Sequence, residues 1–162
     1  MPKIVTPDLY DASAGGVAVI EAQFRGFGQR AEFFGPCETV KCFEDHRLVK
    51  ALSETAGQGR VLVVDGGGSM RVALMGDMLA AGLAGNGWAG AVVFGVIRDT
   101  PQIDALDFGV KALGTTARRS GAEPLGGATG ILVSFGGAAI RPGDWIYADR
   151  DAVLVSATEL NL

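Results

Sequence analysis

The pattern of hydrophobic and polar positions changes its period several times along this 162-residue chain. Residues 60–65 (RVLVVD), which have a glycine on each side, contain a continuous apolar run, and residues 91–97 (AVVFGVI) form a second such run. Short apolar runs rich in β-branched residues are typical of buried strands. Residues 44–55 instead place Leu48, Val49 and Leu52 at helical spacing, which predicts an amphipathic helix that ends at Gly57.

Turn and cap residues delimit the other elements of the first two thirds of the chain. Thr6-Pro7 predicts a short helix, with Thr6 as its N-cap and Gly15-Gly16 as its end. Residues 31–43 (AEFFGPCETVKCF) alternate enough to predict strand, turn and strand. A helix is predicted from near Gly76 to Gly87, and a short helix from Thr100-Pro101 through Phe108.

The chain becomes richer in strand patterns after Val110. The strand-like pieces VKALGTTA, GILVSFG, AAIRPGDWIYAD and AVLVSA are separated by Gly, Pro and Asp turns. Alternating β and α patterns followed by a β-rich third predict a layered α/β fold with a mixed sheet. The length and the absence of any linker predict one domain over residues 1–162.

Composition and charge narrow the class of protein. Hydrophobic residues make up 48% and charged residues 20%, which is typical of a globular protein. The net charge of −4 argues against direct nucleic-acid binding through phosphate neutralisation. We expect neither a signal peptide nor a membrane span, because no apolar stretch is long enough. A reduced cytoplasmic setting is therefore expected for Cys37 and Cys42.

Several motifs favour structural interpretations. Gly85-Asn86-Gly87-Trp88-Ala89-Gly90 matches GxGxxG, but it ends a predicted helix and precedes a strand, which is the reverse of a dinucleotide fingerprint. Gly66-Gly67-Gly68 lacks the tail of a phosphate-binding loop and is interpreted as a tight strand exit. Residues 142–144 (PGD) and 147–149 (YAD) are interpreted as turns, with a catalytic role as the alternative.

The reactive side chains outside these turns offer little to nucleophilic catalysis. Cys37 and Cys42 lack further zinc ligands and are interpreted as structural thiols. His46, the only histidine, is interpreted as a solvated helix residue, and no G-x-S-x-G elbow accompanies it. The four lysines, of which Lys111 is the last, show no desolvated pocket in the pattern, so a Schiff-base mechanism is not indicated.

One charged constellation remains. Asp77 stands at a predicted helix start, and after twenty residues Arg98-Asp99 follows a predicted strand. A helix start and a strand end can meet at one edge of an α/β layer, where they would combine a cation-binding carboxylate, an anion-binding guanidinium and free backbone N–H groups. The alternative is ordinary: a helix N-terminus balanced by Asp77 and a surface charge pair at a strand end.

The segments TVKCFED (39–45), RVLVVDGGGS (60–69) and SFGGAAIRPGDWIYAD (134–149) resemble a known family, together with the Asp77…Arg98-Asp99 spacing. This family contains the ribonuclease E activity regulator A proteins and the class II 4-hydroxy-4-methyl-2-oxoglutarate/4-carboxy-4-hydroxy-2-oxoadipate aldolases. The resemblance covers essentially the whole chain. It implies a β/β/α swivelling-type fold and a homotrimer with sites near subunit contacts.

The resemblance also implies roles for the site residues. It assigns Asp99 to a divalent cation, Mg²⁺ or Mn²⁺, and Arg98 to the substrate carboxylate. Backbone N–H groups around Gly76, Asp77, Met78 and Leu79 would face a 2-oxo acid substrate, and Asp77 would position a metal-bound water for proton transfer. Such a site would cleave 4-hydroxy-4-methyl-2-oxoglutarate and decarboxylate oxaloacetate, because both reactions pass through a pyruvate enolate.

The family contains a second branch, which leaves an alternative open. Its members bind ribonuclease E and slow RNA decay, and some lack the acidic motif. The length of this chain is similar to the regulator branch, whereas its acidic motif is similar to the aldolase branch. The chain also lacks the longer C-terminal extension with which the larger aldolases complete a neighbouring site. The alternative function is therefore a non-catalytic protein inhibitor of ribonuclease E.

Overall fold

Four parallel strands form the centre of the computed structural model, which describes residues 2–162. They are β3 (Phe33–Cys42), β4 (Val61–Asp65), β5 (Gly90–Ile97) and β6 (Val110–Thr115). Every residue of β4 is buried, as is every residue of β5 except the half-buried Phe94. The two apolar runs are therefore the strands that the sequence predicted, and the carboxyl ends of all four strands lie at one edge of the sheet.

Antiparallel strands extend this centre on both sides, so the predicted mixed sheet and strand-rich C-terminal third are confirmed. The sheet order is β1-β11-β10-β3-β4-β5-β6-β2, with β7 paired to the end of β3, while β8 and β9 form a separate hairpin. The bounds are β1 (Val17–Val19), β2 (Arg25–Phe27), β7 (Gly127–Thr129), β8 (Val133–Phe135), β9 (Ala138–Ile140), β10 (Trp145–Ala148) and β11 (Val153–Ser156).

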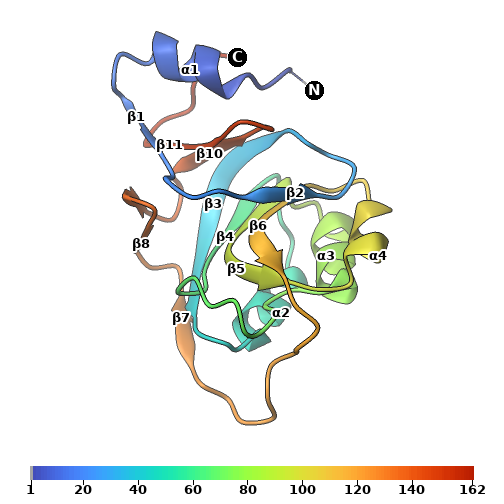
Figure 1. The fold of residues 1–162 in the computed structure, drawn as a ribbon. Helices are drawn as coiled ribbons and strands as arrows, with labels where there is room; N and C mark the ends of the chain where they lie inside the picture. Colours follow the sequence, from blue (N-terminus) through green and yellow to red (C-terminus); the bar gives the residue numbers. More distant parts are fainter. Residues whose placement is uncertain (1) are drawn as a thin grey trace.

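Three short helices gather on one side of the parallel strands (Figure 1). They are α2 (Arg47–Ser53), α3 (Asp77–Gly85) and α4 (Thr100–Asp104), and their apolar side chains join one core with β4 and β5. The opposite face of the sheet packs against the β8–β9 hairpin in a second core. The remaining helix, α1 (Thr6–Ala12), lies beside β11, near both chain ends. Within residues 2–162 no helix has the length and apolarity to cross a membrane.

Residues 31–43 correct one prediction, because they form the single long strand β3 and not two strands with a turn. Residues 33–36 pair with β10, and residues 37–41 pair with β4 on the other side. Pro36 lies at this change of partner, where its missing N–H interrupts neither ladder. Cys37 and Cys42 consequently lie on the same strand.

Helix ends correct other predictions. Thr6 is not an N-cap: the helix begins at Thr6 after Val5, and the Thr6 hydroxyl donates to Asp149 Oδ1 at 2.8 Å. The helices at 47–53 and 100–104 are shorter than their patterns suggested. Residues 147 and 148 belong to β10, whereas Asp149 forms the predicted turn by accepting from the N–H groups of Asp151 and Ala152.

Candidate functional site

The chain segment before α3 runs parallel to the end of β5 and thereby brings the two halves of the predicted constellation together. The Leu74 N–H donates to the Val96 carbonyl at 2.9 Å, and the Arg98 N–H donates to the Met75 carbonyl at 3.0 Å. This register continues by one residue, so Gly76 comes to lie beside Asp99. The helix start and the strand end therefore meet at the carboxyl edge of the parallel strands, where open α/β sheets bind ligands.

Asp99 has a backbone conformation that frees its carboxylate. Its φ of 57° and ψ of 39° lie in the left-handed region, which is uncommon for a residue other than glycine and concentrates at functional sites. Its carbonyl accepts from the N–H groups of Gln102 and Ile103 and so begins α4, but its side chain makes no cap bond. The carboxylate points instead toward Gly76, where a Cβ would lie 2.6 Å from Oδ2.

Arg98 and Asp77 keep their charged groups partly open to solvent. The Arg98 Nε lies 3.5 Å from Asp99 Oδ2, and the side chains of both residues are about one-third exposed (36% and 37%). The Asp77 Oδ1 accepts from the Met78 N–H at 2.9 Å at the start of α3. The Met78 N–H, one of the groups expected to face a substrate, is thus engaged by Asp77. Asp77 also complements the positive end of the helix dipole.

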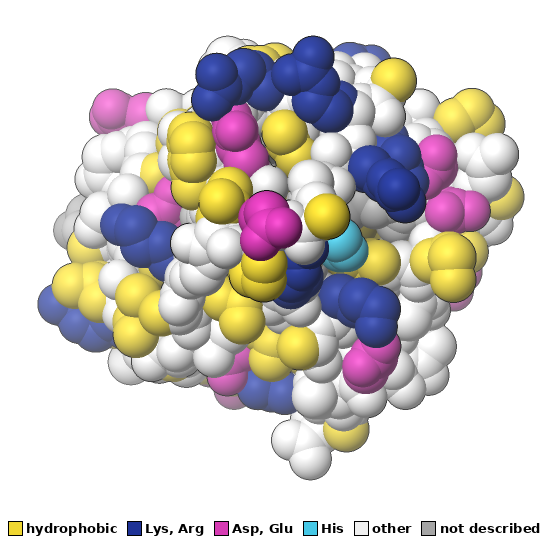
Figure 2. All heavy atoms as spheres, turned by 90° about the horizontal axis from the view of Figure 1, so that it is seen from below, with side chains coloured by type: hydrophobic (Ala, Val, Ile, Leu, Met, Phe, Trp, Pro, Cys, Tyr) yellow, Lys and Arg dark blue, Asp and Glu magenta, His cyan; other side chains and the backbone are white. Residues whose placement is uncertain are grey.

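Three further polar residues line the same cavity, and the sequence interpretation did not place them there: His46, Arg119 and Ser120. His46 is half-buried and not a solvated helix residue. Burial lowers the pKa of His46 below its ordinary value, and the Arg47 cation acts in the same direction against the opposing charge of Asp45. Figure 2 shows the histidine on a face where basic and acidic side chains alternate with hydrophobic ones.

Hydrogen bonds of the buried Asp45 and of Ser120 tie the start of α2 to the loop after β6. Asp45 accepts from Arg47 Nη1 and from the N–H groups of Arg47 and Leu125, while Ser120 Oγ accepts from the His46 N–H at 3.0 Å. Although burial alone would raise the pKa of Asp45, these donors lower it below its ordinary value, so the carboxylate stays charged. The network joins the start of α2 to the loop after β6. Only a long-range contact creates it, so no local pattern could have revealed it.

The cavity of about 160 Å³ suits a small ligand with water around it. Among residues 2–162 no three His, Cys, Asp or Glu side chains converge as a preformed metal cage. The free carboxylate of Asp99 nevertheless fits Mg²⁺ or Mn²⁺, because such ions bind through one or two carboxylates and keep several waters. The donors therefore fit a water-rich cation and do not fit an all-protein site.

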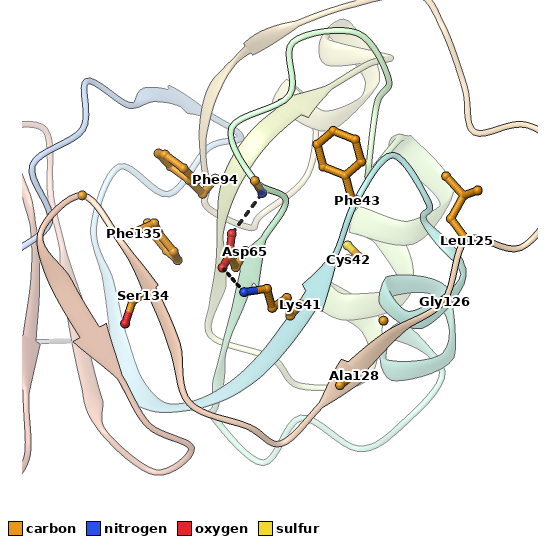
Figure 3. Close-up of a pocket in the computed structure, with 13 residues that line it drawn as sticks. Lys41, Cys42, Phe43, Asp65, Phe94, Leu125, Gly126, Ala128, Ser134 and Phe135 are labelled. Atoms are coloured by element: carbon orange, nitrogen blue, oxygen red, sulfur yellow. Dashed lines mark hydrogen bonds and ion pairs between the residues drawn. The ribbon is translucent and has the colours of Figure 1, made fainter.

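A larger cavity of about 620 Å³ lies on the other face of the sheet, against the β8–β9 hairpin (Figure 3). The rings of Phe94 and Phe135 stack on one side with centroids 4.7 Å apart. The Lys41 Nζ lies 3.9 Å from Asp65 Oδ2 between this stack and Phe43. This cavity is the more voluminous one, but its single carboxylate is tied to Lys41 and to the Gly67 N–H.

The structural interpretations of the other motifs agree with their positions. The segment from Gly85 to Gly90 leaves α3 and enters β5, at the edge of the sheet opposite Asp99. Gly67 and Gly68 have positive φ at the exit of β4. Cys37 and Cys42 are buried free thiols, and burial raises both pKa values to about 12.

Comparisons with known proteins agree with this architecture. Residues 6–155 match the model of the RraA-like family, described as Aldolase/RraA. The chain is 49% identical over 98% of its length, and 97% of the relative's, to the "Putative 4-hydroxy-4-methyl-2-oxoglutarate aldolase" of Azotobacter vinelandii. Two solved structures superpose with TM-scores of 0.93. One, covering 99% of this chain and 96% of its own at 36% identity, is the RNA-processing inhibitor RraA from Thermus thermophilus. The other, covering 97% of both chains at 42% identity, is named S-adenosylmethionine:2-dimethylmenaquinone methyltransferase from Geobacillus kaustophilus.

Proposed function

The chain belongs to the RraA-like family, and we propose that it is a metal-dependent carbon–carbon lyase that releases pyruvate from 4-hydroxy-4-methyl-2-oxoglutarate and from oxaloacetate. The observation that carries this proposal is the meeting of Asp77, Arg98 and Asp99 in one small cavity at a helix start. The aldolase name of the Azotobacter relative supports the same reaction class.

The cavity binds the carboxylate group of the substrate. The Arg98 guanidinium presents a planar fork that matches two oxygens, and each charge-assisted hydrogen bond contributes about 1.5–3 kcal/mol. The N–H groups in the first turn of α3 lack intrahelical partners and face the same anion, although the Met78 N–H first has to leave Asp77. Release of Asp77 by the incoming anion would free its carboxylate to orient a water.

Both reactions break a carbon–carbon bond at C3 of the substrate and leave its electron pair there, as a pyruvate enolate. In the retro-aldol reaction the substrate hydroxyl gives its proton to a water in the cavity, the C3–C4 bond breaks, and pyruvate and a pyruvate enolate result. Oxaloacetate loses CO₂ and leaves the same enolate. A bound divalent cation supplies the Lewis acid that stabilises the enolate charge. Asp99 would hold that cation, and the water oriented by Asp77 would return a proton to the enolate carbon.

The test is pyruvate release by the purified protein from each of the two substrates, with Mg²⁺, with Mn²⁺ and with a chelator. Turnover that requires the cation and exceeds the rate of the cation alone supports the proposal. Metal-independent turnover would reject the metal-dependent mechanism, and no turnover above background would reject the lyase.

A second candidate, inhibition of ribonuclease E, rests on the similarity of nearly the whole chain to the Thermus RNA-processing inhibitor. The two functions can coexist, because a surface interaction leaves the cavity open. Cleavage of a model RNA by ribonuclease E, measured with wild-type protein and with Asp99→Ala, separates them. Equal inhibition by both proteins would support the inhibitor independently of the lyase, and no inhibition would reject it.

The name of the Geobacillus protein points to methyl transfer, for which the small cavity gives less support. Its volume of about 160 Å³ is below the roughly 300–1,000 Å³ of ordinary cofactor pockets. Equilibrium dialysis of wild-type protein and of Arg98→Ala with S-adenosylmethionine tests this point, and we expect no binding that depends on Arg98.

We also propose the homotrimer that the family resemblance implies. Met78, at the rim of the small cavity, is 81% exposed, as expected for an apolar side chain that a neighbouring subunit covers. Light scattering of the purified protein decides it: a trimeric mass supports the proposal, and a monomeric mass rejects it.

A further inference from the structure

Lys111 is an unusual lysine that the proposed lyase mechanism does not use. It lies on β6 between Gly26 of β2 and Val92 of β5, and only 5% of its surface is exposed. The other three lysines, Lys3, Lys41 and Lys50, are exposed. The sequence pattern had indicated no desolvated lysine, and this expectation was wrong for Lys111, because its neighbours come from strands far apart in the sequence.

The ammonium group of Lys111 has no protein partner within residues 2–162. No ion pair and no hydrogen bond is formed by its Nζ, although every fully enclosed side-chain nitrogen or oxygen in the described part of the chain does have a partner. The Nζ therefore faces a cavity and not the core. It lies above Gly26, 3.4 Å from the position that a Cβ would take there, so the glycine leaves room for the charged group.

The cavity beside Lys111 has a volume of about 290 Å³ and an unusual charge for this acidic protein. Three of its lining residues are basic, Arg30, Lys111 and Arg150, and none is acidic. Arg30 is held by a two-pronged contact with Asp107, whereas Arg150 is exposed and has no ion pair within the described residues. The remaining wall is formed by glycine, alanine and two phenylalanines, Phe24 and Phe27.

Two carboxylates, Asp149 and Asp151, line a smaller cavity that adjoins the larger one and shares Phe24, Lys111 and Arg150 with it. Asp149 accepts four hydrogen bonds, from Thr6, Asp151 and Ala152, and forms no ion pair with Lys111. Asp151 is exposed. Burial lowers the pKa of Lys111 below its ordinary value, and Asp149 opposes this effect only partly. A bound anion would supply the partner that the fold does not.

We propose that this cavity is a second binding site, for a small organic anion that carries a carboxylate or phosphate group on a flat apolar body. The anionic group lies between Lys111 and Arg150, and the apolar body lies against Phe24. The site is distinct from the cavity of Asp77, Arg98 and Asp99, since the two share no residue. It is also independent of whether the protein is a lyase.

The experiment uses phenyl phosphate and benzoate as probes, which present the two anionic groups on the same ring. Calorimetric titration of the full chain measures affinity, and amide NMR shifts locate the probe. We expect saturable binding with shifts at Gly26 and Gly28. Loss of one charge-assisted pair predicts affinity at least about tenfold weaker in Lys111→Met and in Arg150→Gln. Arg150 is exposed, so Arg150→Gln preserves the fold even if Lys111→Met does not.

Two control variants separate this site from the other cavities. Lys41→Met removes the lysine of the aromatic cavity, and Arg98→Ala removes the guanidinium of the proposed active site; both should bind the probes as wild type does at the Lys111 cavity. Unchanged affinity in both Lys111→Met and Arg150→Gln would overturn the proposal, as would binding that disappears only in Lys41→Met or in Arg98→Ala. Preference for one probe identifies the anionic group.

Discussion

Two cavities lie at the carboxyl edge of the parallel strands. They differ in volume and in the polar groups that are available to bind a ligand. The larger one, about 620 Å³, is walled by stacked rings, and its one carboxylate is tied to Lys41 and to a turn N–H. The smaller one, about 160 Å³, contains the Asp99 carboxylate, which makes no cap bond and is about one-third exposed, beside the similarly exposed Arg98 guanidinium. Volume alone would favour the first cavity, whereas groups left free to bind a ligand favour the second.

The difference arises from how each cavity uses its polar groups. In the larger cavity Asp65 completes the exit turn of β4, so its removal would affect structure. In the smaller cavity Asp99 begins α4 with its carbonyl, which leaves the carboxylate without a structural task. The comparison therefore predicts that substitutions in the smaller cavity change turnover and those in the larger one change stability.

After the loss of Asp99 itself, the largest effect is expected for Arg98. Replacement by alanine removes the partner of the substrate carboxylate and should lower kcat/KM for oxaloacetate by roughly 10²–10³-fold. Arg98→Lys should recover only part of this loss, because lysine is a point charge without the planar fork. Steady-state kinetics measure both variants. The matched control is Lys41→Met, which removes the cation of the larger cavity. If Lys41→Met lowered kcat/KM as much as Arg98→Ala, the larger cavity would be implicated in turnover as strongly as the smaller one.

Gly76→Ala should have the next largest effect, although it adds one methyl group. Its Cβ would lie 2.6 Å from Asp99 Oδ2, so the carboxylate has to move, and a displacement of about 1 Å can cost about 10²-fold in rate. Gly85→Ala, at the other end of α3, meets no atom within 4 Å and is the matched control. Equal kcat/KM for the two alanine variants would show that the position of Asp99 is unimportant.

Phe135→Leu tests the larger cavity. It removes the ring stacked on Phe94 and should lower the free energy of unfolding by about 1–2 kcal/mol while turnover stays near that of the wild type. Urea unfolding provides the stability, and Phe43→Leu, at a ring that is 51% exposed, should change it little. A strong loss of turnover in a stable Phe135→Leu protein would assign catalysis to the larger cavity.

The smallest effect concerns pH and His46. Burial holds the pKa of His46 below its ordinary value of 6.5, so the unfolded chain binds the proton more readily. Stability should consequently fall as the pH drops through about 6.5 toward the lower folded pKa. In His46→Gln this part of the loss of stability should disappear. At pH 8 the stabilities of the two proteins should differ only through the changed packing of the side chain. Unfolding curves from pH 8 to 5.5 measure it, and parallel declines in both proteins would contradict the role assigned to His46.

The sequence predicted those parts of the molecule that depend on local pattern. The apolar runs at β4 and β5 and the helix start at Asp77 were visible because burial and capping leave a local signature. Their meeting was predictable in outline, since a helix start and a strand end share the carboxyl edge. The family resemblance added the roles that the geometry now has to support.

Other features depend on contacts between distant segments and left no local pattern. His46 joins the small cavity only through the network of Asp45 with the loop after β6. Residues 31–43 form one strand because β10, more than a hundred residues later, pairs with their first half. Lys111 is buried because β2 and β5 flank it, whereas the sequence around it predicted only a strand.

The most direct test of the central claim is pyruvate formation from oxaloacetate by wild-type protein and by Asp99→Ala, each with saturating Mg²⁺ or Mn²⁺ and with chelator. Asp8→Ala, at an exposed carboxylate in the first turn of α1, serves as the control. Cation-dependent turnover that is retained in Asp8→Ala and lost in a folded Asp99→Ala protein is the predicted result. Full turnover in Asp99→Ala would contradict the assignment of the site.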